Sequence, residues 1–260
     1  MDRRAVLAAF DEQIRRRPDP DGPGGRIEHD DRVICSIGGA DGWTGVVWSG
    51  LDEAGADAAI AAQVGRFAQL SRPWEWKHYS YDRPADLDAR LIAAGFTRAP
   101  AETLLVAEIG DLALDVPPPV GVELRAVAGG QDVEALVAVL DEVFGEDHSG
   151  LGRTLIADLD ARSAAGAAIV GWAGESAIGA GRVEFHAGTE FASLWGDATL
   201  PAWRGRGVFR SLVAHRAALA SEAGYRYLQV DASSESRPIF RRLGFAELAT
   251  TTPFMYPGGR

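Results

Sequence analysis

Apolar and polar residues alternate along the chain in patterns that divide it into expected helices and strands. Val133, Leu136, Val137, Leu140 and Val143 keep helical spacing and predict a helix over 131–144. Further helices are expected at 53–70, 151–162 and 206–222, and two short ones, 84–96 and 236–245, end in Gly-Phe. Apolar and aromatic runs predict strands at 33–37, 74–79, 102–108, 121–127, 167–173, 177–186, 190–199 and 224–233, and residues 43–48 form a further apolar stretch.

A proline run separates two halves of this pattern. Pro117, Pro118 and Pro119 cannot continue a helix or lie in a central strand, so residues 110–120 are expected to form a stiff extended linker. The predicted segments are 1–112 and 120–260. In the second segment the expected order is β-α-α-β-β-β-α-β-α-β, with early strands antiparallel and later strands joined through helices.

The sequence from Pro201 to Arg210 predicts an anion-binding turn. A strand end passes through Gly205 and Gly207 into a helix, whose first backbone N–H groups are unpaired and lie at the positive end of its dipole. Glycines allow the backbone to come close to a ligand, so consecutive amides can contact one phosphate group. We therefore expect a pyrophosphate to bind here.

Generic phosphate motifs do not fit this turn. A P-loop needs a lysine directly after its last glycine, but Lys77 is the only lysine of the chain; a dinucleotide fingerprint needs a third glycine where Arg210 stands. The turn instead resembles the Arg-x-x-Gly-x-(Gly/Ala) element of GNAT acetyltransferases, with Arg204 and Gly207 matching and Phe209 departing. Downstream, the strand to Ser233 and the short helix ending at Gly244-Phe245 resemble the second half of the GNAT core.

This resemblance covers roughly residues 120–256 and implies the GNAT fold, a mixed α/β sheet that binds acyl-CoA. The N-terminal half repeats the order of elements: a helix ending in Gly95-Phe96 is followed by strand 102–108, but no Arg-x-x-Gly-x-Gly element opens helix 53–70. It therefore looks like a degenerate second GNAT copy, similar in layout to tandem GNAT proteins such as mycothiol synthases. Trp74 and Trp76 point to one face of their strand and are expected in the core.

The resemblance implies which residues hold acetyl-CoA or another acyl-CoA. Amides of the turn would bind the pyrophosphate, arginine side chains would add contacts, and the strand before the turn would hold the pantetheine arm through backbone groups. Ser233 and Ser236 are expected to reach the same arm or, equally, to act as turn and N-cap residues. The expected cofactor-binding set is Ala198, Thr199, Leu200, Arg204, Gly205, Arg206, Gly207, Val208, Phe209, Arg210, Ser233, Ser236 and Phe240.

Candidates for catalysis lie on the strand before the turn. Period-two geometry predicts that Ser193, Trp195, Asp197 and Thr199 share one face that looks into the reaction cleft. Family members often place an acidic base where this chain has Ser193, so Asp197 becomes the expected base, with backbone hydrogen bonding as its alternative role. Phe240 replaces a tyrosine that often protonates the leaving thiolate, which slows the reaction without preventing it.

Composition and charge argue against several classes of partner and site. A net charge of −11 and a pI near 4.9 argue against nucleic-acid or anionic-membrane binding. The run Arg15–Arg17 is expected to be a solvated helix end, and His148 beside Glu146 and Asp147 to be solvated loop charge rather than a metal site. The single Cys35 excludes an internal disulfide and is expected to be a buried, inert thiol. No membrane span or signal peptide is indicated, which predicts a cytoplasmic protein.

Two functions follow. The first is an acetyl-CoA-dependent N-acetyltransferase that acetylates an amine of a small molecule or of a protein by direct attack on the thioester. The alternative is a catalytically silent acyl-CoA-binding, sensing or interaction protein. The intact turn fits both, Asp197 favours the enzyme, and Phe209, Phe240 and Ser193 favour the silent protein. The acceptor, the acyl chain and the oligomeric state, including a homodimer, stay open.

Overall fold

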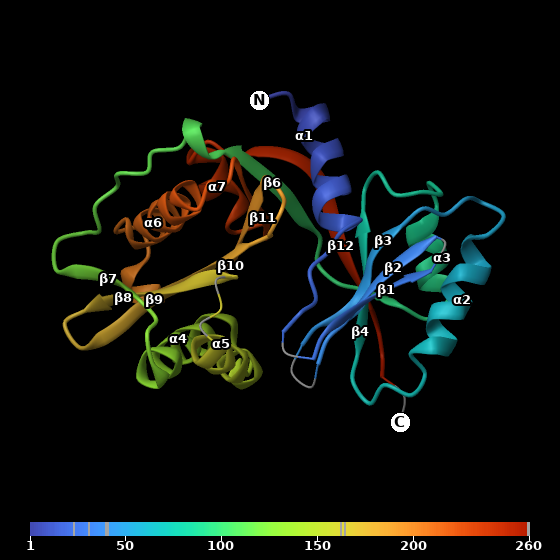
Figure 1. The fold of residues 1–260 in the computed structure, drawn as a ribbon, viewed down its shortest axis with the longest axis horizontal. Helices are drawn as coiled ribbons and strands as arrows, with labels where there is room; N and C mark the ends of the chain where they lie inside the picture. The colour runs from blue at the N-terminus through green and yellow to red at the C-terminus, as the bar shows by residue number, and fades with distance from the viewer. Residues whose placement is uncertain (23, 31, 40–41, 162, 164, 259–260) are drawn as a thin grey trace. The chain divides into compact units, whose positions relative to one another are not determined.

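The computed structural model describes residues 1–22, 24–30, 32–39, 42–161, 163, 165–258. The chain divides into two compact units (Figure 1). Unit 1 comprises Met1 with 106–230 and 239–246, and unit 2 comprises 2–105, 231–238 and 247–260. Because C-terminal segments belong to unit 2, this division by contacts differs from the segments 1–112 and 120–260, which stay a prediction.

Unit 1 holds a sheet in the order β7-β8-β9-β10-β11, antiparallel except for the parallel pair β10–β11. Its elements are η2 (Ile109–Asp111), β7 (Val122–Ala126), α4 (Gly130–Phe144), α5 (Ser149–Ala161), β8 (Gly166–Ala173), β9 (Ser176–Phe185), β10 (Phe191–Thr199), η3 (Pro201–Trp203), α6 (Val208–Glu222), the first part of β11 (Tyr227–Ala232) and most of α7 (Arg237–Arg242). The predicted elements of this half are confirmed; residue 162, the expected end of α5, lies outside the described residues.

Helices cover both faces of the unit 1 sheet. Helix α6 packs on one face through Val208 and Leu212, which join a cluster with Ile169 and Ile178. Helices α4 and α5 lie on the other face (Figure 1), where Leu136 and Leu140 contact Ala180 and Ala198. Each strand residue of β9 and β10 can therefore be assigned to the α6 face or to the α4 face.

Unit 2 repeats the plan of unit 1. Its strands pair in the order β1-β2-β3-β4-β12, antiparallel except for the parallel pair β3–β4. Its elements are α1 (Arg3–Phe10), a π-helical turn η1 (Asp11–Arg15), β1 (Arg26–Asp30), β2 (Val33–Ile37), β3 (Thr44–Ser49), α2 (Ala56–Arg66), β4 (Trp74–Tyr79), α3 (Leu87–Ala93), β5 (Thr97–Arg98), the first part of β6 (Glu102–Glu108) and most of β12 (Ala246–Tyr256).

Corresponding helix ends in the two units have the same geometry. Gly95 after α3 and Gly244 after α7 have φ angles of 100° and 106°, a left-handed conformation that favours glycine. The amide of the next residue, Phe96 or Phe245, bonds at 3.1 Å to the carbonyl five residues earlier. Both phenylalanines are 4% exposed. This match supports a degenerate second copy of the same layout in unit 2.

The core of unit 2 confirms two expectations and corrects one. Trp74 and Trp76 are buried beside α2 and α3, and Cys35 is fully buried, which raises the pKa of its thiol to about 12. Arg15, however, is not solvated: its side chain is 3% exposed and pairs with the equally buried Asp82 through two nitrogens, at 2.9 and 3.0 Å. The sequence could not pair two charges that lie 67 positions apart.

Candidate functional site

Strands β10 and β11 part at their carboxyl ends. They are paired over only three residues, Phe191–Ser193 with 227–229, although β10 continues to Thr199. The edge of β10 beyond Ser193 therefore has no β11 partner in the described chain. Ligands of open α/β sheets bind at the carboxyl ends of parallel strands. We call this opening, which starts after Ser193 and Gln229, the splay.

The helix that follows the turn after β10 begins without a side-chain cap from the described residues. Gly205 and Gly207 have φ angles of 73° and 96°, and Gly207 is the N-cap of α6. A glycine has no side chain to cap the helix, so the first-turn amides keep their donors for another partner. Arg204, Arg206 and Arg210 are all exposed beside this end. Uncapped donors, the helix dipole and three guanidinium groups together form a strongly anion-attracting surface.

Two of these arginines are oriented by the turn itself. The Arg204 Nε donates a hydrogen bond of 3.2 Å to the carbonyl of Thr199, which connects the turn to the end of β10. The Arg206 guanidinium lies 5.0 Å from the centre of the Trp203 ring. The amide of Leu200 donates to the carbonyl of Ile178 on β9 at 2.9 Å. The strand end, the turn and the helix start thus form one connected piece of backbone.

The prediction that Ser193, Trp195, Asp197 and Thr199 share one face is wrong. The register of β10 against β9 shifts between Trp195 and Ala198, where Gly196 has a φ of 62°. Thr199 pairs with Gly179, whose added Cβ would lie 3.1 Å from side-chain atoms of Val208 and Leu212, so this pair faces α6.

On the other side of this β-bulge the alternation is inverted. Gly181 faces α6, since its added Cβ would lie 2.6 Å from the Arg216 guanidinium. The next residue, Arg182, therefore faces α4, as does its partner Trp195, and Ser193 shares that face by alternation. A glycine inside a strand pattern was the signal that could have indicated the bulge.

Asp197 is bound in an ion pair on the α6 face. Its carboxylate accepts a hydrogen bond from the guanidinium of Arg216, and the two side chains are 10% and 0% exposed. Arg216 also donates to the carbonyls of Leu212 and Arg182, each at 3.0 Å. Burial raises the pKa of Asp197, and the charge of Arg216 opposes that rise. The group thus links α6 to β9 and β10.

Ser193 lies at the root of the splay within a polar group that the sequence did not indicate. Its hydroxyl oxygen is 2.6 Å from the Nε2 of His186 and 2.5 Å from the amide nitrogen of Gln229. Ser193 is fully buried, and Gln229 is 4% exposed. Only the register of three strands brings these residues together, so no sequence pattern would have identified His186 or Gln229.

The remaining predicted residues have mainly structural surroundings. Phe240 is fully buried, its ring 5.3 Å from that of Phe209 and 5.0 Å from that of Phe245, so its side chain has no surface for a cofactor. The Ser233 oxygen accepts a 3.3 Å hydrogen bond from the amide of Ser236, as the turn role requires. Both serines belong to unit 2.

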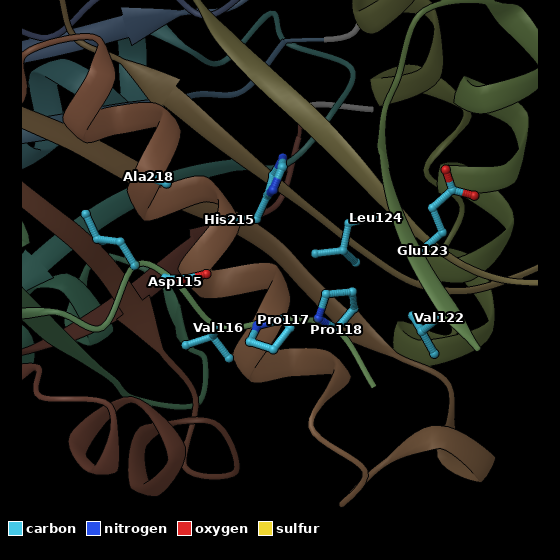
Figure 2. Close-up of a pocket in the computed structure, with 10 residues that line it drawn as sticks. Asp115, Val116, Pro117, Pro118, Val122, Glu123, Leu124, His215 and Ala218 are labelled. Carbon is cyan, nitrogen blue, oxygen red and sulfur yellow. The ribbon is translucent and has the colours of Figure 1, made fainter. Parts of the chain in front are cut away.

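Further features of the described residues concern metal-ligand clusters, membrane-spanning helices and surface pockets. His148 Nδ1 lies 2.9 Å from Asp141, and the described residues hold no group of three or more potential metal ligands. No described helix is long and apolar enough to cross a membrane. A surface pocket of about 410 Å³ lies between residues 114–118, β7 and the middle of α6, where Figure 2 shows His215 and Ala218.

Comparison with known proteins connects this geometry to a family. Residues 133–245 match the acetyltransferase (GNAT) family model. A GCN5-related N-acetyltransferase from Kribbella flavida has a similar structure, with a TM-score of 0.72 and 21% identity over 98% of this chain and 95% of that one. A tandem GNAT protein from the clavulanic acid biosynthesis pathway has a TM-score of 0.61 and 12% identity, covering 93% and 86%. No curated protein matches significantly.

Proposed function

Since residues 133–245 place this chain in the GNAT superfamily, we propose that it is an acetyl-CoA-dependent N-acetyltransferase acting on an amine of a small molecule or a peptide. The observation that carries the proposal is the uncapped start of α6, with Gly207 in a left-handed conformation, directly after a strand that opens from its neighbour. An anion-binding turn beside a splay provides one place for a phosphate group and another for an extended arm.

The residues present fit acetyl-CoA. Amides of Gly205, Gly207, Val208, Phe209 and Arg210, with the side chains of Arg204, Arg206 and Arg210, would bind the pyrophosphate. Backbone groups of Ala198, Thr199 and Leu200 would line the arm. The Thr199 hydroxyl is buried and has no hydrogen-bond partner in the described chain, which leaves a polar atom for a ligand near the turn. The bound thioester would supply an activated acetyl group.

The start of α2 is the internal comparison for this fit. Gly55, the N-cap of α2, has an ordinary φ of −101°, and the carboxylate of Asp52 accepts a 2.7 Å hydrogen bond from its amide. The guanidinium of Arg32 lies where a Cβ at Gly55 would stand, 2.3 Å from that point. A carboxylate of the chain thus binds the N-cap amide of α2 in unit 2. At the start of α6 in unit 1, no side chain of the described residues caps the helix.

Asp197 is better suited to positioning than to proton transfer. As a base it would have to accept a proton while it is held by the buried Arg216 guanidinium, and protonation would leave that charge without its partner. Its face of β10 is covered by α6. The alternative silent protein is favoured by one observation: Phe240 provides no hydroxyl for the departing thiolate. Because a thiolate can leave near neutral pH without full protonation, this favours a slower enzyme as well.

The experiment combines binding and turnover. Acetyl-CoA at 100-fold its Kd should stabilise the protein by about 2.7 kcal/mol, or raise Tm by roughly 5 to 11 °C. Gly207→Asp places a carboxylate at the anion position and should abolish this rise. Gly224→Asp, with a φ of 87° at the other end of α6, carries similar strain and should keep it. Thiol release with a panel of amines then measures transfer.

Three results separate the possibilities. Loss of the Tm rise in Gly207→Asp alone, with amine-dependent thiol release by the unaltered protein, supports the enzyme. A Tm rise without thiol release for any amine supports the silent protein. If folded Gly207→Asp is still stabilised by acetyl-CoA, the turn is not the binding site.

A further inference from the structure

The polar group at the root of the splay forms a chain of contacts from a half-buried histidine to the sheet interior. His186 follows the last residue of β9, Ser193 is the last residue of β10 that pairs with β11, and Gln229 is its partner there. The imidazole Nε2 and the Gln229 amide nitrogen both contact the Ser193 oxygen. This oxygen therefore lies where β10 and β11 begin to separate.

The turn between β9 and β10 fixes the histidine. The Thr189 hydroxyl and the Thr189 amide donate hydrogen bonds of 2.8 and 3.1 Å to the His186 carbonyl. Gly188, with a φ of 75°, allows the chain to reverse between them. The Phe191 amide donates to the Thr189 hydroxyl at 3.1 Å, which connects the turn to the start of β10. His186 thus has a defined backbone position at the splay although it lies outside a strand.

We propose that His186 is the proton acceptor in the acyl transfer, and that Ser193 and Gln229 are positioning residues that orient its ring; this inference rests on the proposed acetyltransferase function. A hydroxyl oxygen has two acceptor lone pairs. The Gln229 amide donates to the Ser193 oxygen, and the imidazole Nε2 forms a second hydrogen bond with that hydroxyl. These two contacts hold the ring at the root of the splay, and the imidazole takes the proton.

The position of His186 meets the requirement of the reaction. From Thr199 back to Ser193 is six residues of strand, roughly 20 Å, along which an extended arm can lie between the turn and the root of the splay. The reacting end of an arm anchored at the turn would then lie near Ser193. His186 is half-buried and is the residue in contact with Ser193 that keeps exposed surface.

The step balances as follows. The ammonium of the acceptor gives one proton to the imidazole of His186, and its nitrogen becomes a neutral nucleophile. The nitrogen lone pair forms the C–N bond to the thioester carbonyl carbon, the C–S bond breaks, and sulfur leaves as thiolate with the bonding electrons. The remaining excess N–H proton passes to water, and the imidazolium later releases its proton to water as well.

The carboxylates of Glu184 and Asp197 are less suited than the imidazole of His186 to accept the proton, because each is paired with a guanidinium group. Glu184, the cross-strand partner of Ser193, accepts a 3.0 Å hydrogen bond from Arg182. Asp197 belongs to the opposite face of the sheet and is paired with Arg216. The carboxylates of Glu184 and Asp197 are therefore bound to guanidinium groups, and the His186 ring contacts the Ser193 hydroxyl.

His186→Gln tests the proposal, because glutamine keeps a hydrogen bond to Ser193 but cannot act as a base. We expect kcat for the best amine of the panel to fall by roughly 10²- to 10⁴-fold, with the acetyl-CoA-induced rise in Tm unchanged. His215→Gln is the matched control: this half-buried histidine of the same unit lines the pocket in Figure 2 and should keep the normal kcat. Added imidazole should restore part of the turnover to His186→Ala.

Ser193→Ala separates positioning from proton transfer. It should lower kcat by about 10-fold, the value of one lost hydrogen bond, without changing acetyl-CoA binding. Full kcat in folded His186→Gln, or no rescue of His186→Ala by imidazole, overturns the role of His186 while the transferase function stands. If the unaltered protein binds acetyl-CoA but releases no thiol with any amine, both the function and this inference fail.

Discussion

Replacing Asp197 by asparagine should reduce stability rather than remove a catalytic base. The substitution keeps the shape of the side chain but removes the charge that balances the buried Arg216 guanidinium. The Arg216 guanidinium would keep its two 3.0 Å hydrogen bonds to the carbonyls of Leu212 and Arg182. Removing one partner of a buried ion pair costs about 3 to 5 kcal/mol. Because the asparagine oxygen can still accept a hydrogen bond, we expect about 3 kcal/mol.

Thermal unfolding measures this cost directly. A loss of about 3 kcal/mol corresponds to a fall in Tm of roughly 6 to 12 °C. Glu184→Gln is the matched control, since it breaks a more exposed pair, with side chains 20% and 40% exposed, and should change the unfolding free energy by less than about 1 kcal/mol. Adding Arg216→Met to Asp197→Asn should restore stability, because it also removes the unbalanced charge.

Measuring kcat of Asp197→Asn distinguishes this structural role from a role as catalytic base. With Asp197 on the covered α6 face, kcat per folded molecule of Asp197→Asn should stay within a few-fold of normal at every pH. If the variant keeps its Tm but loses about 10²-fold or more in kcat near neutral pH, with a smaller loss at high pH, Asp197 is the base. The assignment of the two faces of β10 would then not describe the active protein.

Two further predictions concern unit 2. Burial raises the pKa of Glu102 to about 6, with the charge of Lys77 opposing the shift, so its ionisation should cost stability as pH rises from 4.5 to 6. Glu102→Gln should remove that slope and, after allowance for solvent screening, stabilise the protein at pH 7 by up to about 1 kcal/mol; melts at pH 4.5 and 7 that give equal differences would contradict it. Calorimetry should find one acetyl-CoA per chain, because Asp52 occupies the start of α2; two per chain would show that unit 2 also binds it.

Local signals made some features of both units predictable. Glycines at 205 and 207 between a strand and a helix indicate the turn directly, because few other residues adopt its conformation. Alternation in Trp74–Tyr79 correctly predicted which side chains enter the core, since that strand has no irregularity among its pairs with β12. In both cases the information lies within a few consecutive residues.

The sequence was a poorer guide wherever distant residues decide the outcome. One extra residue near Gly196 inverts the alternation of β10, so counting by twos from Thr199 assigned Ser193 to the wrong face. Arg15 belongs to an arginine run that looked solvated, yet its partner Asp82 comes from another part of the chain. The contact of His186 with Ser193 likewise depends on a turn and a strand register.

The starts of α2 and α6 differ in whether the chain itself supplies a partner for a backbone amide. An open helix N-terminus leaves four amides without partners, which is unfavourable unless water or an anion satisfies them. In unit 2 the carboxylate of Asp52 accepts a hydrogen bond from such an amide, which stabilises the start of α2. In unit 1 Gly207 provides no such group, so the proposed function requires an anion to take that place at α6. Under that proposal, a binding unit would differ from a structural unit in whether the chain supplies its own anion.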